Sequence, residues 1–240
     1  MDAAEKKMRG GKLSIVATPI GNLEDITLRA LCVLREADVI YAEDTRVISK
    51  LLSRYEIKKP LQRLDAATEL KKAEEIIARL EAGENVAFVT DAGTPGISDP
   101  GARLVKAVRR SCESLREAGQ EPHAIEAIPG ASALTAALSI AGVDATEFTF
   151  LGFLPHKKGR QTALKRIKDS EIPVVLYESP HRILKLMQEL ASVQIERVVI
   201  ARELTKMHEE ILDGEPAQLA RKLEEKGAVR GEFVVIIPRS

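Results

Sequence analysis

The segment from Asp91 to Gly101 has the composition of a loop that binds a small molecule. It follows a short apolar run, 86–89, and precedes a periodic segment that begins at Ala102, so we predict that it joins a strand to a helix. Its three glycines and two prolines favour an irregular backbone, because glycine permits positive φ and proline fixes φ. Such a loop can bring main-chain groups against a ligand at the carboxyl end of a strand, where ligands bind in open α/β sheets. A rigid turn that binds nothing is the alternative.

Small or polar residues also follow other predicted strands. The segments concerned are 18–22, 42–46, 128–132, 176–182 and 201–205. Parallel strands direct their carboxyl ends to one edge of a sheet, so the segments of the first half are expected to converge there with the 91–101 loop. If the second half faces the same edge, the site lies between two domains, which is a common location for small-molecule pockets.

The elements that must position these segments alternate between strand and helix in the first half of the chain. Strands are predicted at 13–18, 38–42, 60–64, 86–89 and 123–128, and helices at 26–36, 47–55, 67–81 and 102–118. Asp25 is the predicted N-cap of the first helix. The segment 131–141 is almost entirely apolar, and we expect a helix there that is buried on all sides.

The second half is predicted to contain strands at 148–153, 174–177, 198–201, 207–212 and 233–237, and helices near 159–168, 180–190 and 216–226. Only a short gap precedes the run at 207–212, which favours a hairpin and hence a mixed sheet. The sequence therefore predicts an α/β protein of two domains. The first has a mainly parallel sheet with helices on both faces, and the second has a mixed α/β sheet. The predicted boundaries are a polar tail at 1–12, an N-terminal domain at 13–142 and a C-terminal domain at 147–240.

Composition argues against several classes of function. Lys plus Arg and Asp plus Glu both number 36, so the chain lacks the basic excess of a sequence-independent nucleic-acid binder. With no Trp, three Tyr and five Phe, few rings are available for stacking on bases. Cys32 and Cys112 form neither a disulfide framework nor a metal motif, which fits a reducing cytoplasm. Because residues 1–12 lack an apolar core and no run of ~18 apolar residues occurs, we expect a cytoplasmic protein without membrane contact.

Familiar cofactor and metal motifs are missing from the sequence. There is neither a G-x-G-x-x-G opening the first helix nor a phosphate-binding G-x-x-x-x-G-K-S/T. H-E-x-x-H and C-x-x-C do not occur, and the four histidines are scattered, so chemistry without a metal is expected.

Several motifs together resemble one bacterial family. They are TPIGNL at 18–23, DITLRA at 25–30, AEDTR at 42–46, DAGTP at 91–95, ISDPG at 97–101, GFLP at 152–155, YESPHR at 177–182 and ARELTK at 201–206. The chain resembles the ribosomal RNA small-subunit methyltransferase I group of the tetrapyrrole methylase superfamily from about Leu13 to Ile237. The resemblance implies S-adenosylmethionine-dependent methylation of a cytidine ribose 2′-hydroxyl in the decoding region of 16S rRNA, within the small (30S) ribosomal subunit. It also implies two α/β domains with the cofactor in the cleft between them, and a homodimer.

The resemblance further implies which residues bind the cofactor. These candidates are Pro19, Asp91, Gly93, Ile97, Ser98, Pro129, Gly130, Ser132, Tyr177 and Ala201, with Glu203 beside them. The alternative for the glycines is a turn without a ligand, and for Tyr177 it is a ring buried in the core.

Methyl transfer to a hydroxyl is a direct displacement, so positioning alone can supply ~7–11 kcal/mol, and a general base can add ~10²–10⁴-fold. The catalytic candidates are the strand-end carboxylates Asp44, Glu178 and Glu203. Asp99, His181 and Lys206 are further possibilities for the base. Each carboxylate could instead cap a helix or pair with a nearby arginine.

Five cations are candidates for RNA contact: Arg46, Lys157, Lys158, Arg160 and Arg182. Under the rRNA interpretation the basic run at 157–160 contacts phosphates, although such a run can also be a solvated helix start. A guanidinium binds phosphate or carboxylate in bidentate geometry, so Arg46 and Arg182 could clamp either.

The sequence also departs from the family pattern. Where the family usually has Ser-Tyr-His followed by Asn, this chain has 64–68, LDAAT, which could change RNA contacts or catalytic support. The segment 111–121 is longer than usual, and Ala131 replaces a second proline. Two alternative functions therefore stay open: a methyltransferase of the same superfamily acting on a small corrinoid-type substrate, and a non-catalytic ribosome-binding protein of the same fold.

Overall fold

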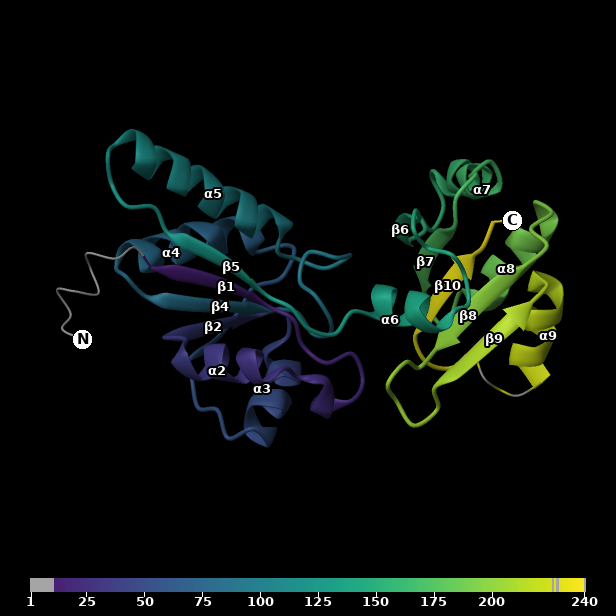
Figure 1. Cartoon of the computed structure of the whole chain (residues 1–240), viewed down its shortest axis with the longest axis horizontal. Helices are drawn as coiled ribbons and strands as arrows, with labels where there is room; N and C mark the ends of the chain where they lie inside the picture. The colour runs from purple at the N-terminus through teal and green to yellow at the C-terminus, as the bar shows by residue number, and fades with distance from the viewer. Residues whose placement is uncertain (1–10, 226, 228, 240) are drawn as a thin grey trace. The chain divides into compact units, whose positions relative to one another are not determined.

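The computed structural model describes residues 11–225, 227 and 229–239 (Figure 1). By its contacts the chain divides into two compact units, Met1–Ser132 and Ala133–Ser240. The predicted domain junction at 142–146 comes later in the sequence than this division. Most of the predicted polar tail lies outside the described residues, and its last residue, Lys12, already belongs to the first strand.

The first unit alternates strand and helix. Its strands are β1 (Lys12–Val16), β2 (Val39–Ala42), β3 (Leu61–Arg63), β4 (Asn85–Val89) and β5 (Ala124–Ile128). Its helices are η1 (Leu23–Asp25), α2 (Leu28–Glu36), α3 (Thr45–Arg54), α4 (Glu69–Glu81) and α5 (Ala102–Glu117). The strands pair in the order β3-β2-β4-β1-β5, and every pairing in this sheet is parallel.

Helices cover both faces of this parallel sheet, as predicted (Figure 1). Apolar residues of α2 and α3, such as Leu34 and Leu51, pack with Ile40 on one face. On the other face α4 and α5 contribute Ile76 and Leu104, which pack in the same core as Phe88. All four residues of β2 are buried because helices cover both faces of the sheet, and a strand in that position lacks the polar alternation of a half-exposed strand.

The first helix begins differently from the prediction. Asp25 ends the short helix η1, and the N-cap of α2 is Thr27, whose side chain accepts a hydrogen bond from the N–H of Ala30 at 3.1 Å. The prediction of Asp25 as the cap was wrong because a one-turn 3₁₀ helix, capped by Asn22, separates the two segments.

The second unit begins with α6 (Ala133–Ile140) and contains the second sheet. Its strands are β6 (Thr149–Phe153), β7 (Val174–Glu178), β8 (Val198–Arg202), β9 (Glu210–Gly214) and β10 (Phe233–Ile237). Its other helices are α7 (Arg160–Lys168), α8 (Ile183–Ser192) and α9 (Pro216–Glu225). The strand order is β6-β7-β10-β8-β9; β6 and β7 are parallel, and the other pairs are antiparallel. The predicted mixed sheet and the β8–β9 hairpin are confirmed.

Helices α7, α8 and α9 supply one apolar core with the strands of this sheet. Leu164, Leu186 and Leu223 are buried there, each from a different helix. Among the described residues, no helix is long and apolar enough to cross a membrane.

Helix α6 is not buried on all sides. It lies against β10, but only Ala137 of the helix is buried, and Ile140 keeps 46% of its surface exposed. The prediction of complete burial was wrong because the apolar composition of a helix does not say how many of its faces its own chain covers.

Candidate functional site

The loops that follow β1 and β4 are joined at the carboxyl edge of the first sheet. Thr18 and Gly93 exchange two backbone hydrogen bonds, of 2.9 and 3.0 Å, and form an isolated antiparallel bridge. The Thr18 hydroxyl also donates to the carbonyl of Thr90 at 3.1 Å. Gly93 adopts φ +81°, and a side chain there would meet Ile20, so glycine fits this position best.

The loop after β5 meets the same edge. The hydroxyl of Thr94 donates to the carbonyl of Ala131 at 3.2 Å, and a Cβ atom on Gly130 would lie 3.0 Å from the Cβ atom of Ala17. The structure thus brings together the three loops that carry the cofactor candidates of the first unit. Those candidates are Pro19, Asp91, Gly93, Ile97, Ser98, Pro129, Gly130 and Ser132.

Carboxylates give this edge a negative character. Asp91 accepts a hydrogen bond from the N–H of Asp44 at 2.8 Å and so joins the β2 and β4 loops. Burial, followed by repulsion from Glu43 and Asp91, raises the pKa of Asp99 to about 6. Burial and the charge of Asp91 likewise raise the pKa of Glu43. These shifts require that the carboxylates lie close enough to interact.

Asp44 is the N-cap of α3 and is bound to Arg46. Its Oδ1 accepts from the backbone N–H of Arg46 at 2.8 Å, and its Oδ2 lies 2.5 Å from Arg46 Nη2. The hydrogen bond from the Arg46 side chain, with that from its backbone, lowers the pKa of Asp44 to about 2. A carboxylate of such low basicity suits a cap better than a general base. The Arg46 side chain itself is 87% exposed and can still reach a phosphate.

Glu69 is a buried residue of this edge that sequence reasoning missed. It is 4% exposed, and its Oε1 accepts hydrogen bonds from the N–H groups of Gly101, Arg103 and Leu104 at 2.9–3.0 Å. It therefore caps α5, the helix that follows the 91–101 loop, although it belongs to α4. An acidic residue in the first turn of α4 is expected to interact with the N-terminus of its own helix. The sequence therefore gives no signal that Glu69 caps a different helix.

In the second unit, Glu178 lies in a buried cluster of ionic groups. Its Oε1 lies 2.7 Å from Arg182 Nη2 and accepts from the N–H of Ser179 at 2.8 Å, and its Oε2 lies 3.9 Å from Arg160 Nη2. Arg160 is also paired with Glu189, whose Oε2 lies 2.6 Å from its Nη2. The carboxylate of Glu178 is fully buried, so this arrangement favours a structural role over proton transfer.

The same cluster fixes the loop after β6. Arg182 donates to the carbonyl of Leu154 at 2.9 Å, and Arg160 donates to that of Pro155 at 3.0 Å. Both guanidiniums are nearly buried, so among the five RNA candidates they have little surface to offer a phosphate. Lys157 and Lys158, in contrast, are exposed.

Glu203 sits at a tight turn after β8. Its Oε1 accepts from Lys206 Nζ at 2.9 Å and from the N–H of Glu232 at 3.0 Å. Burial alone would raise the pKa of Glu203, but these hydrogen bonds and the Lys206 charge outweigh it and lower the pKa. Gly231 is essential to this packing because a Cβ atom there would lie 2.5 Å from Glu203 Cγ.

The two remaining cofactor candidates of the second unit are in or beside the sheet. Ala201 is buried in β8 opposite Val234 of β10. The Tyr177 ring is half-buried near the end of β7 and makes edge contacts with Phe150 and Phe153, at centroid distances of 4.9 and 5.7 Å. Both positions lie at or near the strand ends, as predicted.

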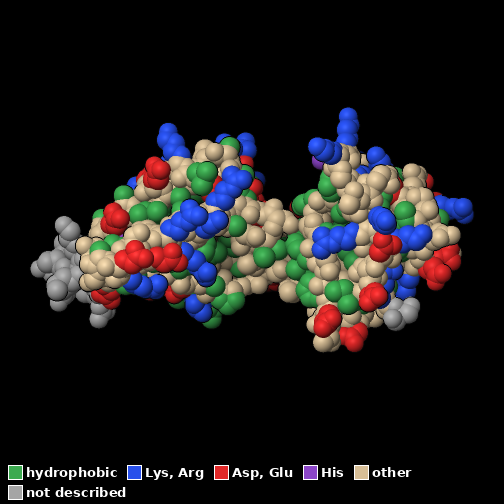
Figure 2. All heavy atoms as spheres, turned by 90° about the horizontal axis from the view of Figure 1, so that it is seen from above, with side chains coloured by type: hydrophobic (Ala, Val, Ile, Leu, Met, Phe, Trp, Pro, Cys, Tyr) green, Lys and Arg blue, Asp and Glu red, His purple; other side chains and the backbone are tan. Residues whose placement is uncertain are grey.

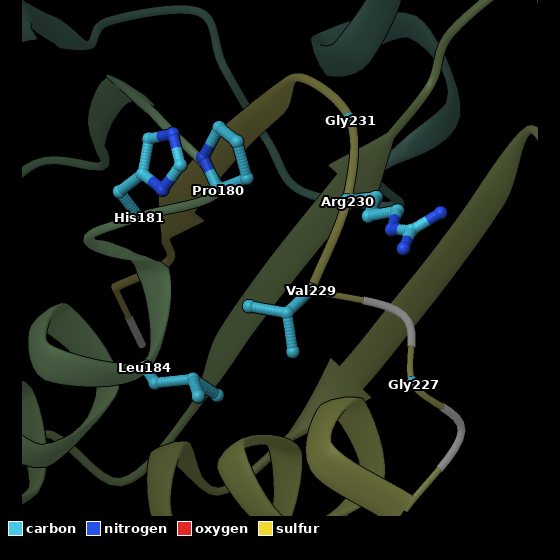
Figure 3. Close-up of a pocket in the computed structure, with 7 residues that line it drawn as sticks. All are labelled: Pro180, His181, Leu184, Gly227, Val229, Arg230 and Gly231. Carbon is cyan, nitrogen blue, oxygen red and sulfur yellow. The ribbon is translucent and has the colours of Figure 1, made fainter.

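A hollow of about 500 Å³ opens near the end of β7 (Figure 3). It is lined by Pro180, His181, Leu184, Gly227, Val229, Arg230 and Gly231. Figure 3 shows the Arg230 side chain pointing away from Pro180 and His181, so the lining is mostly apolar. Of the candidate residues, this lining includes His181, one of the further possibilities for the base. Within the described part of the chain, no group of three or more His, Cys, Asp or Glu residues could hold a metal ion.

Comparison with known proteins gives the family. A family model described as Tetrapyrrole (Corrin/Porphyrin) Methylases matches residues 12–220. A Thermotoga maritima protein named Ribosomal RNA small subunit methyltransferase I is 43% identical over 228 residues, which cover 95% of this chain and 98% of that protein. The chain belongs to the ribosomal RNA small subunit methyltransferase I family of tetrapyrrole methylases. A member of the same name from Borrelia garinii subsp. bavariensis is 44% identical over 236 residues, covering 95% of this chain and 99% of that protein.

Solved structures of tetrapyrrole methylases and a related enzyme share the fold. A diphthine synthase matches with a TM-score of 0.70 at 17% identity, over 95% of this chain and 90% of that one. A cobalt precorrin-4 methyltransferase matches with a TM-score of 0.63 at 17% identity, over 98% of this chain and 96% of that one. At this identity they support the fold alone.

As a member of this family, the chain is a methyltransferase that uses S-adenosylmethionine as methyl donor. The residues at the edge of the first sheet fit such a cofactor. Its sulfonium and ammonium groups are cationic, and Glu43, Asp91 and Asp99 supply negative potential. The loop backbones after β1, β4 and β5 offer main-chain donors and acceptors.

Proposed function

We propose that this chain transfers a methyl group from S-adenosylmethionine to the ribose 2′-hydroxyl of a decoding-region cytidine in 16S rRNA. The observation that carries the proposal is identity of 43–44% over nearly the whole chain with relatives named for methylation of small-subunit ribosomal RNA. Because the proposed substrate is the 30S subunit, the proposal places the enzyme in the cytoplasm, and we also propose that it acts as a homodimer without a metal.

The cofactor supplies an electrophilic methyl group on a positively charged sulfur. The chain must hold the hydroxyl oxygen in line with that methyl carbon and sulfur, which can account for ~7–11 kcal/mol of the barrier. We assign the holding of the cofactor to the loops fixed by the Thr18–Gly93 bridge and by Glu69, together with Tyr177 and Ala201 of the second unit.

Among the candidate carboxylates, Asp99 has the surroundings best suited to a general base. A base near neutral pKa combines availability with basicity, and Asp99 is the one whose pKa is raised to about 6. Asp44 is a helix cap with a pKa of about 2, and Glu178 is enclosed by arginines. Glu203 is held by Lys206. We therefore propose that Asp44, Glu178 and Glu203 support the site and do not take the proton.

The deciding experiment is methyl transfer from labelled S-adenosylmethionine to purified 30S subunits that lack the modification. Label on a nuclease-resistant 2′-O-methylcytidine of 16S rRNA is the expected result. The control is Gly93→Trp, which should abolish cofactor binding because the site tolerates no side chain at φ +81° without strain. Binding of the cofactor without labelled RNA would reject the substrate assignment, and corrinoid-type acceptors should then be tested.

A further inference from the structure

The segment 156–168 is basic and carries no acidic residue. It contains six Lys and Arg residues: Lys157, Lys158, Arg160, Lys165, Arg166 and Lys168. Arg160 is buried in its cluster with Glu189. The other five are exposed, and none of them forms an ion pair with any residue that the structure describes.

Several other cations of the second unit, in contrast, form ion pairs. Arg197 is paired with Asp213 at 2.8 Å, Arg202 lies 3.7 Å from Glu210, and Lys206 lies between two carboxylates. Figure 2 shows blue side chains standing out from this unit beside purple histidine atoms. Unpaired cations close together repel one another, and an external anion would relieve that repulsion.

An exposed aromatic ring precedes the basic segment. Phe153 is the last residue of β6, an edge strand, and 53% of its surface is exposed. The ring rests edge-on against Tyr177 at a centroid distance of 5.7 Å, which fixes it from one side. Only three residues lie between Phe153 and Lys157, so the two lie within ~14 Å of each other.

The loop between this ring and the cations is held from within. Arg182 and Arg160 donate to the carbonyls of Leu154 and Pro155, and the N–H of Arg160 donates to the carbonyl of Lys157 at 3.1 Å. Gly159 takes φ +87° and starts α7. The ring and the cations are therefore presented on a fixed backbone, which reduces the entropy lost when a ligand binds.

We propose that Phe153 and the exposed cations of 157–168 form a binding surface for single-stranded rRNA. The ring stacks on a base, and the cations contact the phosphates on either side of it. Lys165 and Lys168 lie one turn apart on α7, the helix that follows Lys157 and Lys158 in the chain. The inference rests on the proposed function, because it supplies the RNA contacts that such a reaction requires.

Binding of the full-length protein to 30S subunits tests the charged part of the surface. The variants are Lys157→Gln/Lys158→Gln and Lys165→Gln/Arg166→Gln, and the matched control is Arg221→Gln/Lys222→Gln on the exposed side of α9. Each test pair should reduce the slope of log K against log salt concentration by about 1.4, at ~0.7 per phosphate contact of a single strand. The control pair should leave that slope unchanged, and no variant should change the Kd for S-adenosylmethionine.

Phe153→Ala tests the stacking part. It should weaken binding to 30S subunits by roughly 5- to 150-fold, while Phe153→Trp restores binding, because base stacking on an aromatic side chain is sequence-tolerant. Loss of cofactor affinity with unchanged RNA affinity would assign the ring to the adenine of the cofactor and overturn this part of the inference. Equal effects of the α7 and α9 pairs would overturn the charged part.

Failure of this inference is distinguishable from failure of the proposed function. If wild-type protein methylates the subunits and the variants bind them normally, only the surface is wrong. If the variants lose binding but wild-type protein transfers no methyl group, the surface stands and the reaction is wrong. No binding by wild-type protein would reject both.

Discussion

Thr18 and Gly93 are 75 positions apart in the sequence and lie in different loops, yet they pair backbone to backbone through two hydrogen bonds. The pairing joins the loops after β1 and β4, which flank each other in the sheet. Any ligand held by one loop is therefore held against the other. The bridge depends on the positive φ of Gly93, which most residues avoid.

Gly93→Ala should lower both stability and cofactor affinity. A non-glycine residue at φ +81° costs ~1–2 kcal/mol, and its Cβ atom would lie 3.4 Å from Ile20 Cγ2. Gly119→Ala is the matched control, because its φ is +71° but nothing lies within 4 Å of the added atom. Both variants should unfold at a lower temperature than the wild-type protein. Calorimetric titration with S-adenosylmethionine should show weaker binding in Gly93→Ala alone. If Gly93→Ala and the wild-type protein bind S-adenosylmethionine with equal affinity, the bridge is not part of the cofactor site.

Glu69→Ala should destabilise the first unit strongly. Removal of the carboxylate leaves the N–H groups of Gly101 and Leu104 buried without an acceptor, at ~1–3 kcal/mol for each group. Glu74→Ala, on the exposed side of the same helix, should change the free energy of unfolding by less than ~0.5 kcal/mol. Urea denaturation measures both. A small effect of Glu69→Ala would mean that water replaces the carboxylate.

Glu178→Ala should behave as a folding variant rather than a catalytic one. It leaves Arg182 and Arg160 in a buried site without their shared carboxylate, and breaking a buried pair costs ~3–5 kcal/mol. Glu178→Gln keeps the volume and should cost less. In the fraction that stays folded, kcat for methyl transfer should lie within a few-fold of wild type. A fall of 10²-fold or more in folded Glu178→Gln would instead restore its catalytic assignment.

Asp99 should set the acid limb of the pH profile. Burial and its neighbours Glu43 and Asp91 raise its pKa to about 6, and the base acts when ionised, so kcat/KM should fall as the pH drops below about 6. Asp99→Asn should lower kcat by ~10²–10⁴-fold and remove this limb. Asp44→Asn should keep the limb, because the pKa of Asp44 is about 2. An unchanged limb in Asp99→Asn would assign it to another group.

The same shift predicts the sign of a stability change. Folding raises the pKa of Asp99 from its ordinary value of 3.8 to about 6, so the folded state holds the proton more tightly. The free energy of unfolding should therefore fall as the pH rises through that window. Asp99→Asn should remove this fall, and melting curves at pH 4 and pH 7 would reveal it.

The order and type of the elements followed from the sequence because apolar runs and helical periodicity are local signals. Strand β9 was less accurately placed: 207–212 was predicted, and Glu210–Gly214 is observed. Glu203 and Thr205 both adopt positive φ, so the residues that follow β8 form a tight turn and β9 begins later than predicted. A run of apolar residues does not reveal such a turn.

The site was predictable at the level of loops but less so for individual charges. The irregular composition of the 91–101 segment marks the edge that carries the cofactor candidates. Burial of Arg160 depends on Glu189, which lies 29 residues further along the chain and on another helix. Whether a charged residue is solvated or paired is set by tertiary contacts, so the sequence made Arg160 a candidate for RNA contact and Glu178 a catalytic candidate. Glu69 was overlooked for the same reason.

The central position of β10 has a consequence for synthesis. This strand is the last of the described strands in chain order, yet it lies in the middle of the second sheet, between β7 and β8, with all five residues buried. The first sheet can form as soon as β5 has left the ribosome, whereas β7 and β8 must wait for residue 237 before they gain a common neighbour. A nascent chain stalled before Phe233 would therefore leave one edge of β7 and one edge of β8 unpaired, and should be a substrate for chaperones.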